Sequence, residues 1–169
     1  MLSVSLLVCA MMALTRANDD EILNVNMTIG KVGNDSRLFV VNAGPACPGN
    51  WIPYGDRCFY LETTKKSWAQ AEKNCQSLGG NLASVHSEDE YIFIQSMTTE
   101  PAWIGGSDCQ ERGAWFWIGG APMDYTFWCP SQPDNTNDQC CLQMNIGDGK
   151  CWDDQPCNKA QKSICVKKH

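Results

Sequence analysis

The chain has 169 residues, a length typical of one domain with an extension, and it carries 13 Lys and Arg against 19 Asp and Glu, a formal charge of −6. This acidic balance argues against nucleic acid and anionic membranes as partners, and it favours local binding of cations. No apolar run reaches the roughly 20 residues that a spanning helix needs, so we expect no membrane insertion.

Residues 1–17 are expected to form a secretory signal peptide. Leu2 to Leu14 is an apolar run, and Ala17 is a small residue suited to cleavage, although a basic start is missing. Secretion places the chain outside the cell, where disulfides persist. Cys9 would leave with this segment.

Residues 18–46 show little hydrophobic periodicity and contain several glycines. We interpret them as an acidic pro-segment or linker, with a short strand at Leu38–Val41. Asn26 and Asn34 each begin an Asn-X-Ser/Thr sequence, so both are candidate N-glycosylation sites.

Two helices are predicted at the start of the domain that follows. Ser67 and Gln70 match a capping box, and Gly79 with Gly80 would end this first helix. Ser87 opens the second helix in the same way, and His86 before it is expected to be structural. Trp68, Ala71, Cys75 and Leu78 follow at helical spacing in the first helix, and Tyr91 and Ile94 are expected on the inner face of the second.

The second half reads as strands around one long loop. A buried strand is predicted at Ala102–Gly105, and a closing strand at Ser163–Val166. Two paired strands are predicted at Cys141–Asn145 and Lys150–Asp154. Gly, Pro, Asn and Asp break regularity over residues 107–138, and a connection of that length is usually functional.

Ten of the 11 cysteines lie beyond the predicted signal peptide. An even number in a small secreted chain indicates a disulfide framework. A zinc site is the alternative, but no CxxC pair is present and only His86 and His169 offer imidazoles. The sequence alone leaves the pairing open.

Two cysteine spacings are informative without a pairing scheme. Cys47 and Cys58 bracket a hairpin-sized loop, so we expect them to pair locally. Cys140 and Cys141 are adjacent, and a bridge between neighbours would be strained. Because successive strand residues face opposite sides, these two are expected to reach different partners on two sides of one strand.

Oxygen ligands gather in two short motifs near the end of the chain, Gln132-Pro133-Asp134 and Trp152-Asp153-Asp154. Calcium takes six to eight oxygens, which carboxylates and side-chain amides supply. The two motifs therefore indicate a candidate calcium site. The sequence shows no arrangement of a nucleophile and a general base, so we do not expect this protein to be an enzyme.

Taken together, the two helices, Trp103-Ile104-Gly105-Gly106, the long loop, Trp152-Asp153-Asp154 and Cys165 resemble a C-type lectin domain. The resemblance implies an α+β fold over residues 47–166, with two helices packed on small antiparallel sheets and a long loop region stapled by disulfides. A monomer is expected.

A narrower resemblance is to the fish type II antifreeze proteins. The segments that carry it are the leader sequence, Trp103 to Cys109, and Cys140 to Asn145. The resemblance to both families implies five disulfides, namely Cys47–Cys58, Cys75–Cys165, Cys109–Cys140, Cys129–Cys151 and Cys141–Cys157.

The resemblance also implies a ligand set for calcium and a cis peptide before Pro133. Gln139 stands where calcium-dependent members commonly have Glu, so binding is expected to be weak, roughly 10⁻⁴–10⁻³ M. The implied calcium ligands are Gln132, Asp134, Gln139, Asp153 and Asp154.

Two functions follow from the resemblance, and both use the same loop. The first is adsorption to ice, with Thr136 offering a methyl and a hydroxyl, whereas the exposed Asp138 would suit ice poorly. The alternative is a galactose-binding lectin of fish innate defence, which the Gln-Pro-Asp order favours; a recognition scaffold with a vestigial site is a third hypothesis. The residues expected to contact ice or sugar are Gln132, Asp134, Thr136 and Asp153.

The tryptophans are expected to serve mainly the core. Trp128 lies nearer the loop and is the one candidate for stacking on a sugar. The expected core tryptophans are Trp103, Trp115, Trp117 and Trp152.

Overall fold

A computed structural model describes residues 47–169 except residue 137, and these residues lie within one compact unit. Several predictions fall outside the described residues. They are the signal peptide over residues 1–17, the linker over 18–46, the strand at Leu38–Val41, and the candidate glycosylation sites Asn26 and Asn34.

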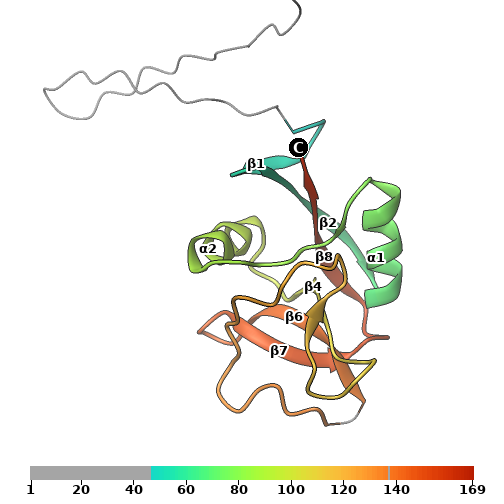
Figure 1. Ribbon diagram of the computed structural model, residues 1–169, viewed down its shortest axis with the longest axis vertical. Helices are drawn as coiled ribbons and strands as arrows, with labels where there is room; N and C mark the ends of the chain where they lie inside the picture. The colour runs from blue at the N-terminus through green and yellow to red at the C-terminus, as the bar shows by residue number, and fades with distance from the viewer. Residues whose placement is uncertain (1–46, 137) are drawn as a thin grey trace, which may run out of the picture. The chain divides into compact units, whose positions relative to one another are not determined.

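An eight-stranded sheet runs through the unit in the order β1-β2-β8-β4-β6-β7, with β3 beside β8 and β5 beside β4 (Figure 1). Neighbouring strands are antiparallel except β4 and β8, which are parallel. The α+β fold class is confirmed, but the strands form one mixed sheet and not the small antiparallel sheets that were predicted, because β4 pairs with β8 in parallel. The strands are β1 (Ile52–Tyr54), β2 (Arg57–Lys66), β3 (Asn81–Leu82), β4 (Ala102–Ser107), β5 (Phe116–Trp117), β6 (Gln139–Ile146), β7 (Cys151–Pro156) and β8 (Gln161–Lys168).

Helix α1 (Trp68–Ser77) begins at the predicted capping box. The Ser67 hydroxyl accepts a hydrogen bond from the Gln70 N–H at 3.4 Å, and the Gln70 side chain accepts one from the Ser67 N–H at 3.3 Å. Of the residues at helical spacing, Trp68, Ala71 and Cys75 are buried. Leu78 lies at the C-cap, because α1 ends at Ser77, and it is 39% exposed.

Helix α2 (Glu88–Met97) lies on the other side of the sheet from α1 in Figure 1. Its cap differs from a full capping box, because the Glu90 carboxylate accepts from the N–H of His86 at 2.8 Å, one residue before the Ser87 cap. Tyr91 and Ile94 are buried as predicted. None of the helices in the described part of the chain is long and apolar enough to cross a bilayer.

His86 joins the start of α2 to the long loop. One ring nitrogen lies 2.7 Å from an Asp124 oxygen, and the other lies 2.9 Å from the Ser84 hydroxyl. The Ser84 hydroxyl also accepts a hydrogen bond from Arg57 at 2.9 Å. This linked Ser, His and Asp set was not evident from sequence, and it ties the body of the domain to residues near 124.

Strand β2 is the main element that the sequence reasoning missed. It pairs with β8 from Arg57 opposite Lys168 to Glu62 opposite Ser163. Its second half is exposed or half-buried and rich in Thr and Lys, so it lacks a strong apolar alternation. Pairing with a distant strand, rather than local pattern, makes this segment extended.

Trp152 is the centre of the aromatic core. The centroids of four rings lie within 6.0 Å of its ring centroid, and all four rings meet it edge-on. Trp103, Trp117 and Trp152 are buried as predicted, whereas Trp115 is half-buried and packs against Trp128 at 4.8 Å. The rings around Trp152 are Tyr91, Trp117, Tyr125 and Trp128.

Candidate functional site

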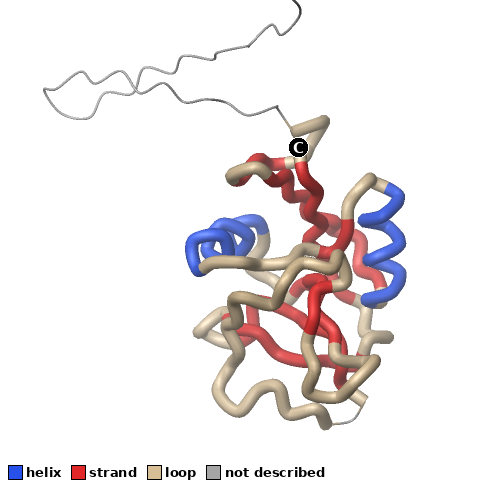
Figure 2. Tube along the Cα trace, in the orientation of Figure 1, coloured by secondary structure: helices blue, strands red, loops and turns tan. Residues whose placement is uncertain are grey.

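The candidate site is built where the end of the long loop returns to the sheet. The backbone around Trp128 runs beside β7, with the Trp152 N–H bonded to the Phe127 carbonyl and the Cys129 N–H bonded to the Trp152 carbonyl, both at 2.8 Å. Figure 2 shows this long connection as loop at the end of the domain that holds β6 and β7. The loop over residues 131–138 therefore begins beside Asp153 and Asp154.

The Gln132–Pro133 peptide is cis, which agrees with the expectation from the resemblance. Cis peptides are largely confined to bonds before proline. Just after it, the Asp134 N–H donates to the Gln132 side-chain oxygen at 2.9 Å. The triplet thus forms a tight turn whose polar side chain satisfies its own backbone.

Asp154, on β7, anchors this turn to the sheet. Its side chain is fully buried, and its two oxygens accept hydrogen bonds from the Asp134 N–H at 3.1 Å and the Asn135 N–H at 2.9 Å. Burial raises the pKa of the Asp154 carboxyl, and the two N–H donors oppose that rise. Asp154 therefore fixes the loop backbone to β7.

Asp134 and Thr136 form the exposed part of the network. One Asp134 oxygen accepts from the Thr136 N–H at 3.0 Å and from the Thr136 hydroxyl at 2.9 Å. These bonds, the backbone one first, hold the pKa of the Asp134 carboxyl below its ordinary value. The Thr136 methyl and hydroxyl are thus held in place on the surface.

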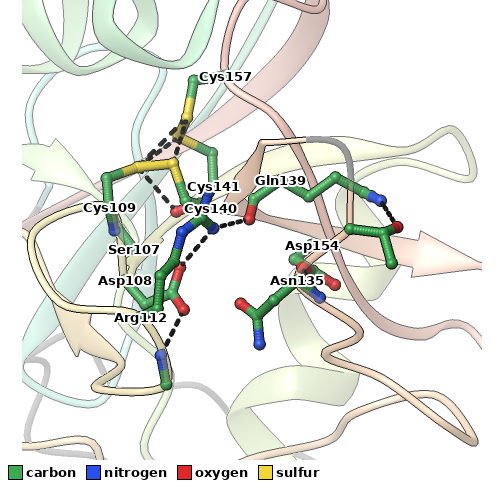
Figure 3. Close-up of polar contacts among 12 residues, drawn as sticks. Ser107, Asp108, Cys109, Arg112, Asn135, Gln139, Cys140, Cys141, Asp154 and Cys157 are labelled. Atoms are coloured by element: carbon green, nitrogen blue, oxygen red, sulfur yellow. Dashed lines mark hydrogen bonds and ion pairs between the residues drawn. A yellow bond between two sulfur atoms is a disulfide. The ribbon is translucent and has the colours of Figure 1, made fainter.

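Gln139 closes the loop at the start of β6. Its side-chain nitrogen lies 2.9 Å from the Thr136 hydroxyl oxygen and 3.4 Å from an Asp134 oxygen. Its backbone carbonyl accepts a hydrogen bond from Arg112, whose guanidinium also lies 3.5 Å from the buried Asp108 carboxylate (Figure 3). The segment from Asp108 to Arg112, at the start of the long loop, is thereby attached to Gln139 as well.

Asp153 is placed differently from the other predicted ligands. It is buried, and one of its oxygens accepts from the side-chain amides of Gln143 at 2.7 Å and Gln155 at 2.8 Å. Gln155 also donates to the Gln139 side-chain oxygen at 3.1 Å. The structure therefore joins Asp153 to the predicted set through Gln155.

Four of the five predicted ligands have the chemistry that calcium prefers, but the oxygens of the three carboxylates do not all lie within 4.8 Å of one another, so this structure does not gather them around one point. Asp134, Asp153 and Asp154 bring carboxylates, and Gln132 brings an amide oxygen, which are the ligands that calcium prefers. Gln139 does not fit as it lies, because its N–H₂ group faces Asp134 and its oxygen faces Gln155. Calcium at this site would require the Gln139 amide to turn over.

The exposed loop face does not line the pocket found in the described part of the chain. A pocket of about 610 Å³ lies elsewhere, and its lining residues include Arg57, Ser84, His86 and Glu90 but none from the loop over 131–138. Ser131 and Asp138 lie exposed beside the network. The arrangement at the loop suits contact with a surface more than enclosure of a small ligand.

The base of the loop is stapled by paired disulfides. The structure contains the same five pairs that the resemblance implies. Cys109–Cys140 joins the start of the long loop to β6, and Cys129–Cys151 joins its later part to β7. These two bridges flank the loop over residues 131–138.

The prediction that Cys140 and Cys141 reach two sides of one strand is wrong. Their partners differ, but the Cys140 and Cys157 sulfurs of the two bridges lie only 3.4 Å apart (Figure 3). A β-bulge is the reason: Gln139 lies opposite Pro156 and Cys141 opposite Gln155, so Cys140 is an extra residue that breaks the alternation. Because all four sulfurs are in disulfides, none is a thiolate that could bind zinc.

Comparison with known proteins agrees with this architecture. The lectin C-type domain family matches residues 64–167, more than half of the chain. The chain belongs to the C-type lectin domain family. Within it, the type-2 ice-structuring protein of Hemitripterus americanus is 52% identical over 166 residues, which cover 98% of each chain.

Two solved structures similar to this C-type lectin domain differ in their use of calcium. A calcium-independent type II antifreeze protein is 46% identical with a TM-score of 0.71, covering 73% of this chain and 95% of its own. A Ca²⁺-dependent type II antifreeze protein in its Ca²⁺-free form is 45% identical with a TM-score of 0.69, covering 72% and 99%. The scaffold is thus compatible with either use of the metal.

Sequence reasoning missed the residues that support the predicted site. Gln155 lies two residues after Asp153 on β7, so strand alternation places both on one face, and this was a usable signal. Arg112 follows Asp108 by four residues, a spacing that also suggests a pair. The supporting residues are Asp108, Arg112, Gln143, Gln155 and Lys159.

Proposed function

We propose that this protein is a secreted antifreeze protein that adsorbs to ice through the exposed part of the long loop that holds Asp134, Asn135 and Thr136. The observation that carries the proposal is that this loop is exposed and yet fixed by hydrogen bonds and flanking disulfides. Asp154 holds its backbone, Asp134 holds Thr136, and Cys129–Cys151 and Cys109–Cys140 flank it. The likeness to type-2 ice-structuring proteins supports the same function.

Rigidity matters because ice offers neither a charged group nor a unique pocket. A binding face must therefore match ordered water over an area, and a loop that has to be ordered on contact loses binding free energy. The hydrogen bonds around Thr136 hold its hydroxyl and methyl before contact. Adsorbed molecules would make the growth front curve between them and lower the local freezing point.

Calcium has a secondary place in this proposal. Gln132, Asp134, Asp153 and Asp154 would hold it, and it would supply positive charge that draws their oxygens together. The neutral Gln139 removes one carboxylate from the expected set, so affinity would be roughly 10⁻⁴–10⁻³ M. Adsorption to ice would then persist without the ion.

The test is thermal hysteresis of the secreted, disulfide-bonded protein, measured with calcium and with excess chelator. A freezing gap in both conditions is expected. A gap that vanishes on chelation would make calcium essential, and no gap in either condition would sink the antifreeze proposal.

Substitutions at Thr136 locate the ice face. Thr136→Ser keeps the hydroxyl bonds to Asp134 and Gln139 and removes one methyl, so it should reduce the gap while leaving the melting temperature nearly unchanged. Thr63→Ser, which removes the same methyl from an exposed residue of β2, is the matched control. An unchanged gap in Thr136→Ser would move the ice face away from this residue.

A galactose-binding lectin is the second candidate. Gln132 and Asp134 flank the cis peptide and lie beside Asp154, as a sugar site of this family would require. Trp128 supports it less, because this half-buried ring packs against Trp115 and Trp152. Retention on galactose agarose with calcium, and release by chelator, would favour the lectin, which on this proposal should not occur.

A further inference from the structure

We infer that Gln155 is a positioning residue that turns the N–H₂ group of Gln139 toward the loop and thereby weakens calcium binding there. The inference rests on the proposed function only in that the same loop is the ice-binding face. It concerns a series of hydrogen-bonded side chains, most of them amides, that runs from β7 and β8 to the loop. Its members are Lys159, Gln155, Asp153, Gln143, Gln161 and Gln139.

The direction of the Gln155 amide is set by its two charged partners. The Lys159 ammonium, which can only donate, lies 2.9 Å from the Gln155 side-chain oxygen. An Asp153 carboxylate oxygen, which accepts, lies 2.8 Å from the Gln155 side-chain nitrogen. Turning the Gln155 amide over would place donor against donor at one end and acceptor against acceptor at the other.

A buried set of amides supports Asp153 in the same way. The Gln143 amide donates to the same Asp153 oxygen at 2.7 Å, and Gln161 donates to the Gln143 oxygen at 2.8 Å. Asp153, Gln143 and Gln161 are all buried. The Asp153 carboxylate, which accepts from Gln155, is therefore held inside the domain, where a buried polar group without a partner would be costly.

The direction of Gln155 then sets that of Gln139. The Gln155 nitrogen lies 3.1 Å from the Gln139 side-chain oxygen, so the Gln139 nitrogen must face the other way. There it donates to the Thr136 hydroxyl and the Asp134 carboxylate. At this corner an amide N–H does what a cation would do, since it offers positive charge to Asp134.

The consequence is a competition between the amide chain and calcium. Calcium beside Asp134 would gain a ligand if the Gln139 oxygen turned toward the loop, but that turn breaks the hydrogen bond between this oxygen and the Gln155 amide. Removing the Gln155 amide should therefore free Gln139 to turn and improve calcium affinity. Because Gln155 also donates to Asp153, itself a predicted ligand, an effect that acts through Gln139 must be accompanied by a change in the contact between the Gln139 amide and Thr136.

The experiment is calcium titration of the full, disulfide-bonded protein by isothermal calorimetry. Gln155→Leu should lower the Kd for calcium about fivefold, the size of one hydrogen bond. Lys159→Met should lower it about twofold, because Lys159 is exposed and its interaction is screened. Lys168→Met removes the same charge from the far end of β8 and should leave Kd unchanged, which controls for net charge.

A second measurement protects the test against misfolding. In the wild-type protein, NMR should show proximity between the Gln139 side-chain N–H₂ protons and the Thr136 side chain, and Gln155→Leu should weaken it. An unchanged calcium Kd in Gln155→Leu, or no such proximity in the wild type, would overturn the inference. Neither the calorimetry nor the NMR involves ice, so both test this inference independently of the antifreeze proposal. Absence of thermal hysteresis in the wild-type protein would count against the antifreeze proposal and not against this inference.

Discussion

The half of the domain built on β2 and β8 and the half built on the long loop are held together by different means. Between β2 and β8 a regular ladder pairs the backbone, from Arg57 opposite Lys168 to Glu62 opposite Ser163. In the loop half, side chains satisfy the backbone: Asp154 accepts two loop N–H groups, and Asp108 accepts the Gly113 N–H at 2.8 Å. Irregular chain stays ordered when carboxylates and disulfides replace the ladder.

The backbone of the loop half also needs this support for conformational reasons. Three non-glycine residues in the loop adopt positive φ, with values of 66° at Ser131, 52° at Asn135 and 58° at Asp138. Asn and Asp tolerate this left-handed region better than most residues. A functional face on such a backbone depends on the residues that hold it in place.

The largest expected effect comes from removing the ring at the centre of the aromatic core, against which the loop half packs. Trp152 is fully buried and touches rings from α2 and from the long loop. Trp152→Ala should lower the free energy of unfolding by about 3–5 kcal/mol through the cavity it leaves. Chemical denaturation followed by circular dichroism measures this, with the partly exposed Phe116→Ala as a control that should cost much less.

The next effect separates the two halves. Replacing Cys129 and Cys151 by Ser removes the bridge beside the ice face, whereas replacing Cys47 and Cys58 removes one at the other end. Each double change should cost about 3 kcal/mol of unfolding free energy. Thermal hysteresis should fall sharply in the first and persist in the second; equal losses would show that the bridge acts on global stability alone.

A smaller effect is expected at the loop anchor. In Asp154→Asn, one of the two loop N–H groups faces an amide N–H₂ instead of an oxygen, which should cost about 1–3 kcal/mol. Hydrogen exchange at the Asp134 and Asn135 amides should accelerate, while exchange within β2 and β8 should not. Asp148→Asn, in an exposed turn, is the matched control.

The smallest effect is a dependence on pH at the same residue. Burial raises the pKa of the Asp154 carboxyl in the folded state, so the folded protein takes up this proton at a higher pH than the unfolded chain. This group alone therefore makes folding more favourable as the pH falls from its folded pKa toward the ordinary value near 3.8. The stability difference between the wild type and Asp154→Asn should widen from pH 7 to pH 4, and a narrowing would contradict this sign.

Local signals in the sequence were enough to place both helices and the candidate site. Ser67 with Gln70 and Ser87 with Glu90 mark helix starts because a cap is satisfied within one turn. The Gln-Pro-Asp and Trp-Asp-Asp motifs identified the loop and its anchor strand. The helix starts depend on residues close together in the chain, and the roles given to the two motifs depend on the family resemblance.

The tertiary structure alone decided the features that depend on distant partners. The strand at Arg57–Lys66 needs β8, the shared side of Cys140 and Cys141 needs a bulge against β7, and the direction of the Gln139 amide needs Gln155. An amide can present oxygen or nitrogen with equal ease, so its chemistry is set by what it faces. That is why the sequence and its family resemblance could predict the candidate ligands, whereas only the folded arrangement determined that the Gln139 side chain presents a hydrogen-bond donor to Asp134.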